Sequence, residues 1–218
     1  MRAFIFDMDG VIINSEPLHF QVESELAKEK GIALKEGELE SYVGVRADEM
    51  WASLKAKHRA SFDVDELLVE ANEKKLAYLN DASIEPIEGI RELLAQLKEK
   101  GYKVGLGSSS PVAFIDAVLT AFSIKNQFDV VLSGEQVTKG KPAPDIYLEV
   151  AKQLGVEPQD CTVLEDAAHG VQAGKAAGMD VIGFVNPHSG NQDLSKADHV
   201  IKGISDITIQ TESVSVRN

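Results

Sequence analysis

The sequence predicts an α/β protein with a doubly wound (Rossmann-like) parallel sheet and an inserted all-α segment. Short apolar runs recur along the chain without strict polar alternation, as is typical of strands buried on both faces of a parallel sheet. A turn and an amphipathic helical segment follow each run, and strands that alternate with helices favour right-handed crossovers. One stretch after the first run shows helical periodicity alone, which indicates an insertion.

The core elements follow from these runs and from turn residues. We predict strands at Ala3 to Phe6, Lys103 to Gly107, Val130 to Leu132, Cys161 to Leu164, Val181 to Val185 and His199 to Ile201. Core helices are predicted at Glu88 to Lys100, Pro111 to Phe122 and Pro144 to Leu154, two of which have proline where it suits a first helical turn. The polar stretch after Ile209 is expected to fray.

The helical insertion is expected to span residues 15–79, within a core formed by residues 1–14 and 80–218. Its predicted helices run from Pro17 to Lys30, Asp48 to Arg59 and Val64 to Leu79. Residues 80–83 (Asn-Asp-Ala-Ser) suit a return linker. One continuous domain with a long excursion is the alternative.

Composition excludes several classes of protein. The net charge is -13, and 22 basic residues are scattered among 35 acidic ones, which argues against a nucleic-acid partner. A single cysteine permits no intramolecular disulfide. The N-terminal run is too short and too acidic for a signal peptide or a membrane span. We expect a cytoplasmic monomer that binds neither nucleic acid nor membrane.

Polar side chains follow the predicted strands, and parallel strands place their carboxyl ends at one edge of the sheet, where ligands bind. These side chains are Asp7 and Asp9 after the first strand, Ser108, Ser109 and Ser110 after the second, Lys141 after the third, and Glu165 and Asp166 at the fourth. Read singly, the aspartates suit a turn, the serines a helix N-cap, and Lys141 a solvated loop like its neighbour Lys139.

The carboxylates in this set predict a metal site. Packed carboxylates repel one another, and a hard divalent cation relieves that repulsion. Oxygen ligands beside a phosphate suit Mg²⁺. We expect Asp7 and Asp166 as side-chain ligands and Asp9 as a ligand through its backbone carbonyl. Glu165 lies close by, in direct contact or through water.

The remaining groups suit a phosphate. Hydroxyl groups and helix N-terminal amides around Ser108 and Ser109 form an anion site, and Lys141 adds a positive charge. Asp7 is then the expected nucleophile, through an aspartyl-phosphate, and Asp9 the general acid and later the base. Neighbouring carboxylates are expected to help Asp9 stay protonated.

Together, Asp7-Met8-Asp9-Gly10, Ser108, Lys141 and Glu165-Asp166 resemble the four motifs of the haloacid dehalogenase-like phosphatases, in order and over essentially the whole chain. The insertion resembles the helical cap of the β-phosphoglucomutase-like subfamily. This resemblance implies that Glu16 and His19 help to bind the leaving group, that His19 assists Asp9, and that the loop bearing Arg46 faces substrate. Lys74 is a weaker candidate in the cap.

The expected function is a phosphatase for a small phosphorylated metabolite, with a hexose or pentose phosphate as the leading guess by analogy. A β-phosphoglucomutase is the alternative, but Arg46 comes one residue early for its cap loop, and Pro111 stands where the mutase has a lysine. A non-catalytic signalling module phosphorylated on aspartate is a remote alternative. Such modules lack an acid at the position of Asp9 and have no cap.

Overall fold

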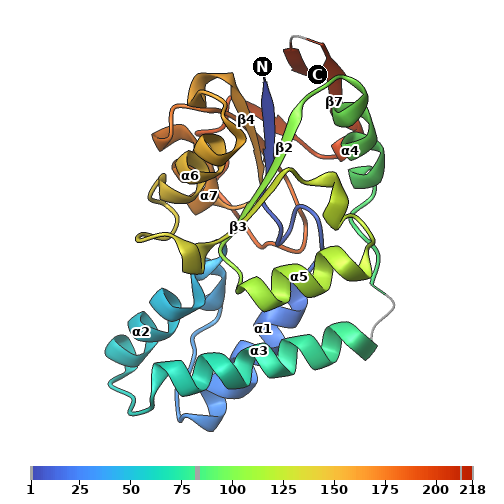
Figure 1. Cartoon of the computed structure of the whole chain (residues 1–218). Helices are drawn as coiled ribbons and strands as arrows, with labels where there is room; N and C mark the ends of the chain where they lie inside the picture. Colours follow the sequence, from blue (N-terminus) through green and yellow to red (C-terminus); the bar gives the residue numbers. More distant parts are fainter. Residues whose placement is uncertain (1, 82–83, 212, 218) are drawn as a thin grey trace.

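A computed structural model describes residues 2–81, 84–211 and 213–217. Its centre is a parallel sheet of six strands in the order β3-β2-β1-β4-β5-β6 (Figure 1). The strands are β1 (Ala3–Phe6), β2 (Lys103–Ser108), β3 (Val130–Ser133), β4 (Cys161–Glu165), β5 (Asp180–Phe184) and β6 (His199–Ile201). The predicted fold class is confirmed, and β5 begins and ends one residue earlier than expected. The order places β1 between β2 and β4, so the side chains after these strands become neighbours.

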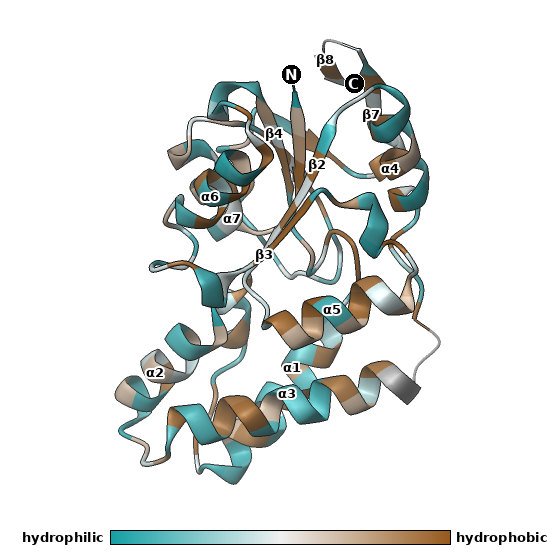
Figure 2. Ribbon diagram, in the orientation of Figure 1, coloured by the Kyte–Doolittle hydropathy of each residue, from teal (hydrophilic) through white to brown (hydrophobic). Residues whose placement is uncertain are grey.

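Helices cover both faces of the sheet. They are α4 (Ile90–Glu99), α5 (Val112–Ala121), α6 (Asp145–Leu154) and α7 (Ala168–Ala176). In β1, Phe4 and Phe6 enter one hydrophobic cluster while Ala3 and Ile5 enter a second, because successive side chains point to opposite faces of a sheet. Both faces are therefore apolar, which explains the runs without alternation. Figure 2 shows apolar residues along the strands and polar residues on the outer sides of the helices.

The segment between β1 and α4 is helical. It contains α1 (Glu16–Glu29), the short 3-10 helix η1 (Leu39–Tyr42), α2 (Ala47–His58) and α3 (Val64–Asp81). These helices lie beyond the carboxyl ends of the strands, apart from the sheet (Figure 1). We call residues 15–79 the cap; that they form a separate domain stays a prediction. Residues 82 and 83 of the expected return linker lie outside the described residues.

The C-terminal residues correct one expectation. Instead of fraying, β7 (Ile207–Gln210) and β8 (Ser213–Val216) pair in an antiparallel ladder. Ile207 and Ile209 are buried in the same hydrophobic cluster as the apolar residues of α4, and Val214 and Val216 pack against it, so alternate residues of both strands hold the segment to the core. Four 3-10 helices complete the fold: η2 (Lys125–Gln127), η3 (Gly134–Gln136), η4 (Pro158–Asp160) and η5 (Ile204–Asp206). Within the described ranges, every helix is too short or too polar to cross a bilayer.

Candidate active site

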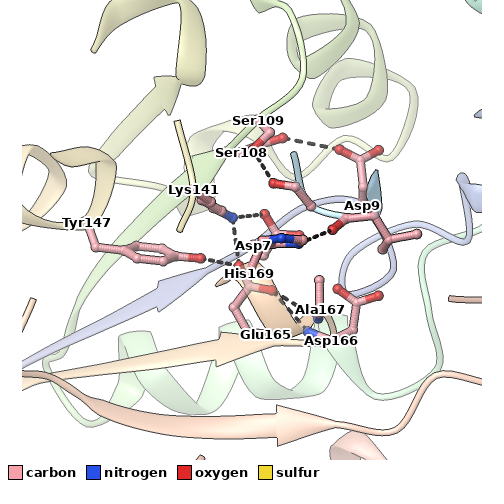
Figure 3. Close-up of polar contacts among 12 residues, drawn as sticks. Asp7, Asp9, Ser108, Ser109, Lys141, Tyr147, Glu165, Asp166, Ala167 and His169 are labelled. Atoms are coloured by element: carbon pink, nitrogen blue, oxygen red, sulfur yellow. Dashed lines mark hydrogen bonds and ion pairs between the residues drawn. The ribbon is translucent and has the colours of Figure 1, made fainter. Parts of the chain in front are cut away.

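A buried charge cluster forms where β1 and β4 end. Asp7 follows β1, Glu165 ends β4, and Lys141 comes from the connection between β3 and α6. Lys141 Nζ donates to Asp7 Oδ1 at 2.6 Å and to Glu165 Oε1 at 2.7 Å (Figure 3). The three side chains are at most 6% exposed, so water screens their charges little. Residues far apart in the sequence thus meet at one point, as the sheet order requires.

Burial and charge act against each other in this cluster. Burial raises the pKa of Asp7 well above its usual value and outweighs the opposing effect of Lys141, while nearby carboxylates raise the pKa further. Burial also favours a neutral Lys141, but Asp7 and Glu165 outweigh it and raise the pKa of Lys141 above its usual value. The lysine therefore stays charged between two carboxyl groups, and a third acid, Asp166, lies beside them.

Glu165 is the most completely bonded member. Its Oε1 accepts from Lys141 and from the Tyr147 hydroxyl at 2.5 Å, and its Oε2 accepts from the backbone N–H groups of Asp166 and Ala167 at 3.1 and 3.3 Å. A Cβ on Gly170 would lie 1.7 Å from Oε1, so only glycine lets α7 pass this carboxylate. Both oxygens of Glu165 thus accept hydrogen bonds in this conformation, and the carboxylate holds Lys141 in place; whether it also contacts a metal stays a prediction.

Sequence reasoning missed Tyr147. This residue lies on the buried face of α6 beside Ile146 and Val150, so its spacing is that of ordinary packing. Besides its hydrogen bond to Glu165, its ring centroid lies 4.9 Å from Lys141 Nζ, a cation–π distance. The aromatic ring thus completes the enclosure of the lysine, and no periodicity in the sequence signals it.

The acids at this edge fit a divalent cation. Ligand atoms of Asp7, Glu165 and Asp166 all lie within 4.8 Å of one another, the one such acidic group found in the described part of the chain. Asp166 Oδ2 accepts a hydrogen bond from Ser189, but its buried Oδ1 has no partner. Burial first, and then the charges of Glu165 and Glu16, raise the pKa of Asp166. A buried carboxylate oxygen without a donor is costly, and a metal ion would satisfy it.

The backbone at Gly10 makes room for that carboxylate. Gly10 has φ = +76°, and a Cβ there would lie 1.9 Å from Asp166 Oδ2. The turn after Asp9 therefore passes so close to Asp166 that no side chain fits between them. The Asp9 carboxylate itself lies outside the acidic group. That Asp9 binds a metal through its backbone carbonyl stays a prediction.

Asp9 points toward hydroxyl groups and a histidine. Its Oδ1 accepts from Ser15 Oγ at 2.6 Å and contacts His19 Nε2 at 2.9 Å, while its Oδ2 accepts from Ser108 Oγ at 3.2 Å and Ser110 Oγ at 2.7 Å. Burial raises the pKa of Asp9, but His19 and the hydroxyl groups outweigh it and lower that pKa below its usual value. The expectation of a protonated Asp9 is therefore wrong for this conformation.

The serine segment after β2 joins the core to the cap. Ser108 is fully buried, and besides contacting Asp9 its Oγ accepts from the Ser110 amide at 3.0 Å. Ser109 Oγ donates to the backbone carbonyl of Gly44 in the cap at 2.8 Å. In this conformation the hydroxyl groups predicted to bind phosphate are thus bonded to Asp9 and to the cap loop.

The cap supplies one wall of a pocket over Asp7 and Asp9. The pocket measures about 70 Å³, and its charged cap residues are Glu16, His19, Glu23 and Lys75. Lys75 Nζ donates to Glu23 Oε1 at 2.9 Å in a buried ion pair between α1 and α3. Burial and the charge of Asp9 raise the pKa of Glu16 well above its usual value. Sequence reasoning placed Glu16 and His19 here but missed Glu23 and Lys75.

Two cap residues differ from expectation. Lys74 lies outside the pocket and pairs at the surface with Glu29 and Glu70. Successive helix residues point about 100° apart, so Lys74 is turned away from the pocket that its neighbour Lys75 faces. Arg46 is also absent from the pocket lining.

The guanidinium of Arg46 has other partners. It pairs with Asp48 and donates to the backbone carbonyls of Gly134 and Val137 at 3.2 Å each. It therefore fastens the start of α2 to the loop after β3. The loop that bears it does line the pocket, through Gly44 and Val45, so only the Arg46 side chain lies away from the expected place.

Asp7 beside Lys141, with an acidic group that could hold a cation, thus lies at the carboxyl ends of the strands. A model of the haloacid dehalogenase-like hydrolases matches residues 4–184, and the chain belongs to that family. A signalling module without enzymatic activity is therefore set aside.

Relatives within the family are similar over almost their whole length. The chain is 34% identical to hexitol phosphatase B of Escherichia coli, over 94% of each chain. It is 32% identical to β-phosphoglucomutase of Bacillus subtilis, over 96% of this chain and 93% of that protein. The crystal structure of β-phosphoglucomutase from Clostridium difficile has a TM-score of 0.83 and 30% identity, covering 94% of this chain and 92% of that one.

Proposed function

We propose that this enzyme is a Mg²⁺-dependent phosphatase that hydrolyses the phosphomonoester of a small polyhydroxylated metabolite, such as a sugar or sugar-alcohol phosphate. The observation that carries the proposal is the buried cluster at the strand ends. Asp7 is held 2.6 Å from the Lys141 ammonium, and Asp166, whose buried Oδ1 has no partner, belongs to the same acidic group. A carboxylate nucleophile, a fixed positive charge and a metal site are what phosphoryl transfer needs.

In the proposed first step an Asp7 oxygen forms a bond to phosphorus as the bond from phosphorus to the ester oxygen breaks. Lys141 remains beside Asp7 and neutralises charge on the phosphoryl oxygens, while Ser108 and Ser109 exchange their present partners for that group. Magnesium, bound by Asp7 and Asp166, would supply further charge neutralisation. Water then attacks the phosphorus, releasing inorganic phosphate and restoring the Asp7 carboxylate.

Asp9 is the proposed proton donor to the leaving alkoxide and the later acceptor of the proton from water. His19, Ser15 and Ser110, which contact its carboxylate, favour its ionised form. To carry a proton it must give up part of this set, and two members, Ser15 and His19, belong to the cap. Movement of the cap therefore offers a direct way to switch Asp9 between its two forms. Opening is also needed for entry, because 70 Å³ is well below the volume of a typical small-molecule pocket.

The pocket wall favours a leaving group without a second negative charge. Its two basic side chains are already paired, His19 with Asp9 and Lys75 with Glu23. Glu16 and Glu23 add oxygen atoms that can hydrogen-bond hydroxyl groups, and neither carries a charge that would attract a second anion. The name of the hexitol phosphatase relative agrees with a polyhydroxylated substrate.

A β-phosphoglucomutase is the second candidate, since relatives of that name cover nearly the whole chain. A mutase must hold a second phosphate in the cap, which requires an available cation. Arg46, the residue expected to do so, is bonded to Asp48 and to backbone carbonyls outside the pocket. This observation favours the phosphatase.

Phosphate release from a panel of sugar, sugar-alcohol and small acid phosphates tests the proposal, with Mg²⁺ or with chelator. We expect the wild-type enzyme to release phosphate from the phosphates of neutral polyols when Mg²⁺ is present. Asp7→Asn should release none, because an amide is not a nucleophile. Release by Asp7→Asn at the wild-type rate would refute the nucleophile. If no compound releases phosphate but β-glucose 1-phosphate is converted to glucose 6-phosphate with a bisphosphate primer, the enzyme is a mutase.

A further inference from the structure

The connection between β5 and β6 contains a buried serine that neither the motifs nor the proposed mechanism uses. Ser189 is 1% exposed, and its Oγ donates a hydrogen bond to Asp166 Oδ2. The other oxygen of Asp166, Oδ1, is buried and has no partner. The serine therefore engages one oxygen of the carboxylate and leaves the other available.

The backbone around Ser189 is held from two directions. Asn186, also buried, donates from Nδ2 to the carbonyl of Gly10 at 2.7 Å and to Asn14 Oδ1 at 2.8 Å. The amide of Ser189 in turn donates to the Asn186 carbonyl at 3.2 Å. These contacts fix the serine relative to the turn that follows Asp7 and Asp9.

A glutamine ties the other end of the same segment. Gln192 accepts from the Ala168 amide, at the start of α7, at 3.1 Å and donates to the Ser189 carbonyl at 3.0 Å. It also donates to the Glu40 carbonyl in the cap at 3.3 Å. Ser189 is thus attached to the nucleophile turn, to the helix after Asp166, and to the cap.

We infer that Ser189 is a positioning residue for the metal site, and that its hydrogen bond turns Asp166 so that Oδ1 faces the cation. This inference rests on the proposed metal dependence. Partners that orient a ligating carboxylate characteristically contribute to metal affinity, and their removal costs about tenfold to a hundredfold. Without the serine hydroxyl, Asp166 gains rotational freedom and a second buried oxygen loses its donor.

Titration calorimetry of the whole, metal-free protein with MgCl₂ tests the inference. We expect Ser189→Ala to weaken Mg²⁺ binding by about tenfold or more. Ser189→Cys, of nearly the same size but a weak donor, is expected to weaken binding as well, whereas Ser189→Thr keeps the hydroxyl and retains most of the affinity. Ser195→Ala, an exposed serine in the same connection, is the matched control and should bind as the wild type does.

Activity at increasing Mg²⁺ separates positioning from structural damage. If Ser189 orients the ligand, saturating Mg²⁺ restores the kcat of Ser189→Ala, and the melting temperature of the metal-free variant stays near that of the wild type. Mg²⁺ affinities of Ser189→Ala and Ser189→Cys within twofold of the wild type would overturn the inference alone. If the wild-type protein binds no Mg²⁺, both the inference about Ser189 and the metal dependence of the proposed function are overturned.

Discussion

The two walls of the active site are built differently. On the core side, Asp7, Lys141 and Glu165 form one continuous cluster, and each stands at the end of a strand or in the loop that follows. On the cap side, charged residues project from helices as separate pairs, such as Glu23 with Lys75. The sheet order fixes the first set, whereas helix rotation and side-chain choice fix the second. The two walls meet at Asp9, which bonds Ser15 and His19 of the cap, so we expect changes elsewhere in the cap to alter selectivity more than chemistry.

The largest expected effect is on the core side, at Lys141. In Lys141→Met, Asp7 and Glu165 lose their shared cation, and the phosphoryl group loses a fixed positive charge. We expect kcat to fall by at least about a hundredfold, as when a preorganised donor is removed from an active site. Initial rates at saturating substrate and Mg²⁺ measure this.

Lys139→Met is the matched control, because Lys139 is exposed two residues away. It should retain wild-type rates. Equal rates for the two variants would show that the core-side cluster is dispensable, and would contradict its assignment to the chemistry.

A smaller effect is expected on the cap side, at Lys75. In Lys75→Met, Glu23 stays buried without its counter-charge, and breaking a buried pair in this way costs about 3 kcal/mol of unfolding free energy. Substrate preference should shift at the same time, while dependence on Asp7 and Mg²⁺ remains. Urea unfolding and kcat/KM across the substrate panel are the measurements.

The neighbouring lysine sharpens this comparison. Lys74 makes its ion pairs at the surface, and Lys74→Met should leave both stability and substrate preference unchanged. If Lys75→Met altered kcat equally for every substrate, without altering preference, the cap pair would belong to the chemistry and the separation would fail.

The smallest effect is expected at Arg46. Arg46→Met removes the contacts of the guanidinium with Asp48 and with the loop carbonyls, which lie partly in solvent. We expect a loss of stability of about 1 kcal/mol or less and a less than tenfold change in kcat/KM. Arg59→Met, at the exposed far end of α2, is the control. A hundredfold rise in KM would instead mean that Arg46 binds substrate in an open conformation.

The core wall could be predicted from the sequence because strand ends follow from hydrophobic runs, and parallel strands bring those ends together. Asp7, Lys141 and Asp166 needed no further information. Tyr147 and Lys75 could not be found this way, since a buried helix residue shows in sequence only its period, not its polar partner. Ser189 lies in an irregular connection, where no period exists. Arg46 was misplaced because a neighbouring aspartate competes for its guanidinium.

Gly10 and Gly170 carry no functional group, yet each gives up its side-chain space to a site carboxylate: Gly10 to Asp166 and Gly170 to Glu165. In a saturation mutagenesis experiment scored by activity, both positions would tolerate as little change as Asp7, although neither touches the reacting atoms. Intolerance in such a data set therefore marks occupied volume as well as chemistry. In this enzyme, the two causes of intolerance are distinguished by the atom that a new methyl group would displace.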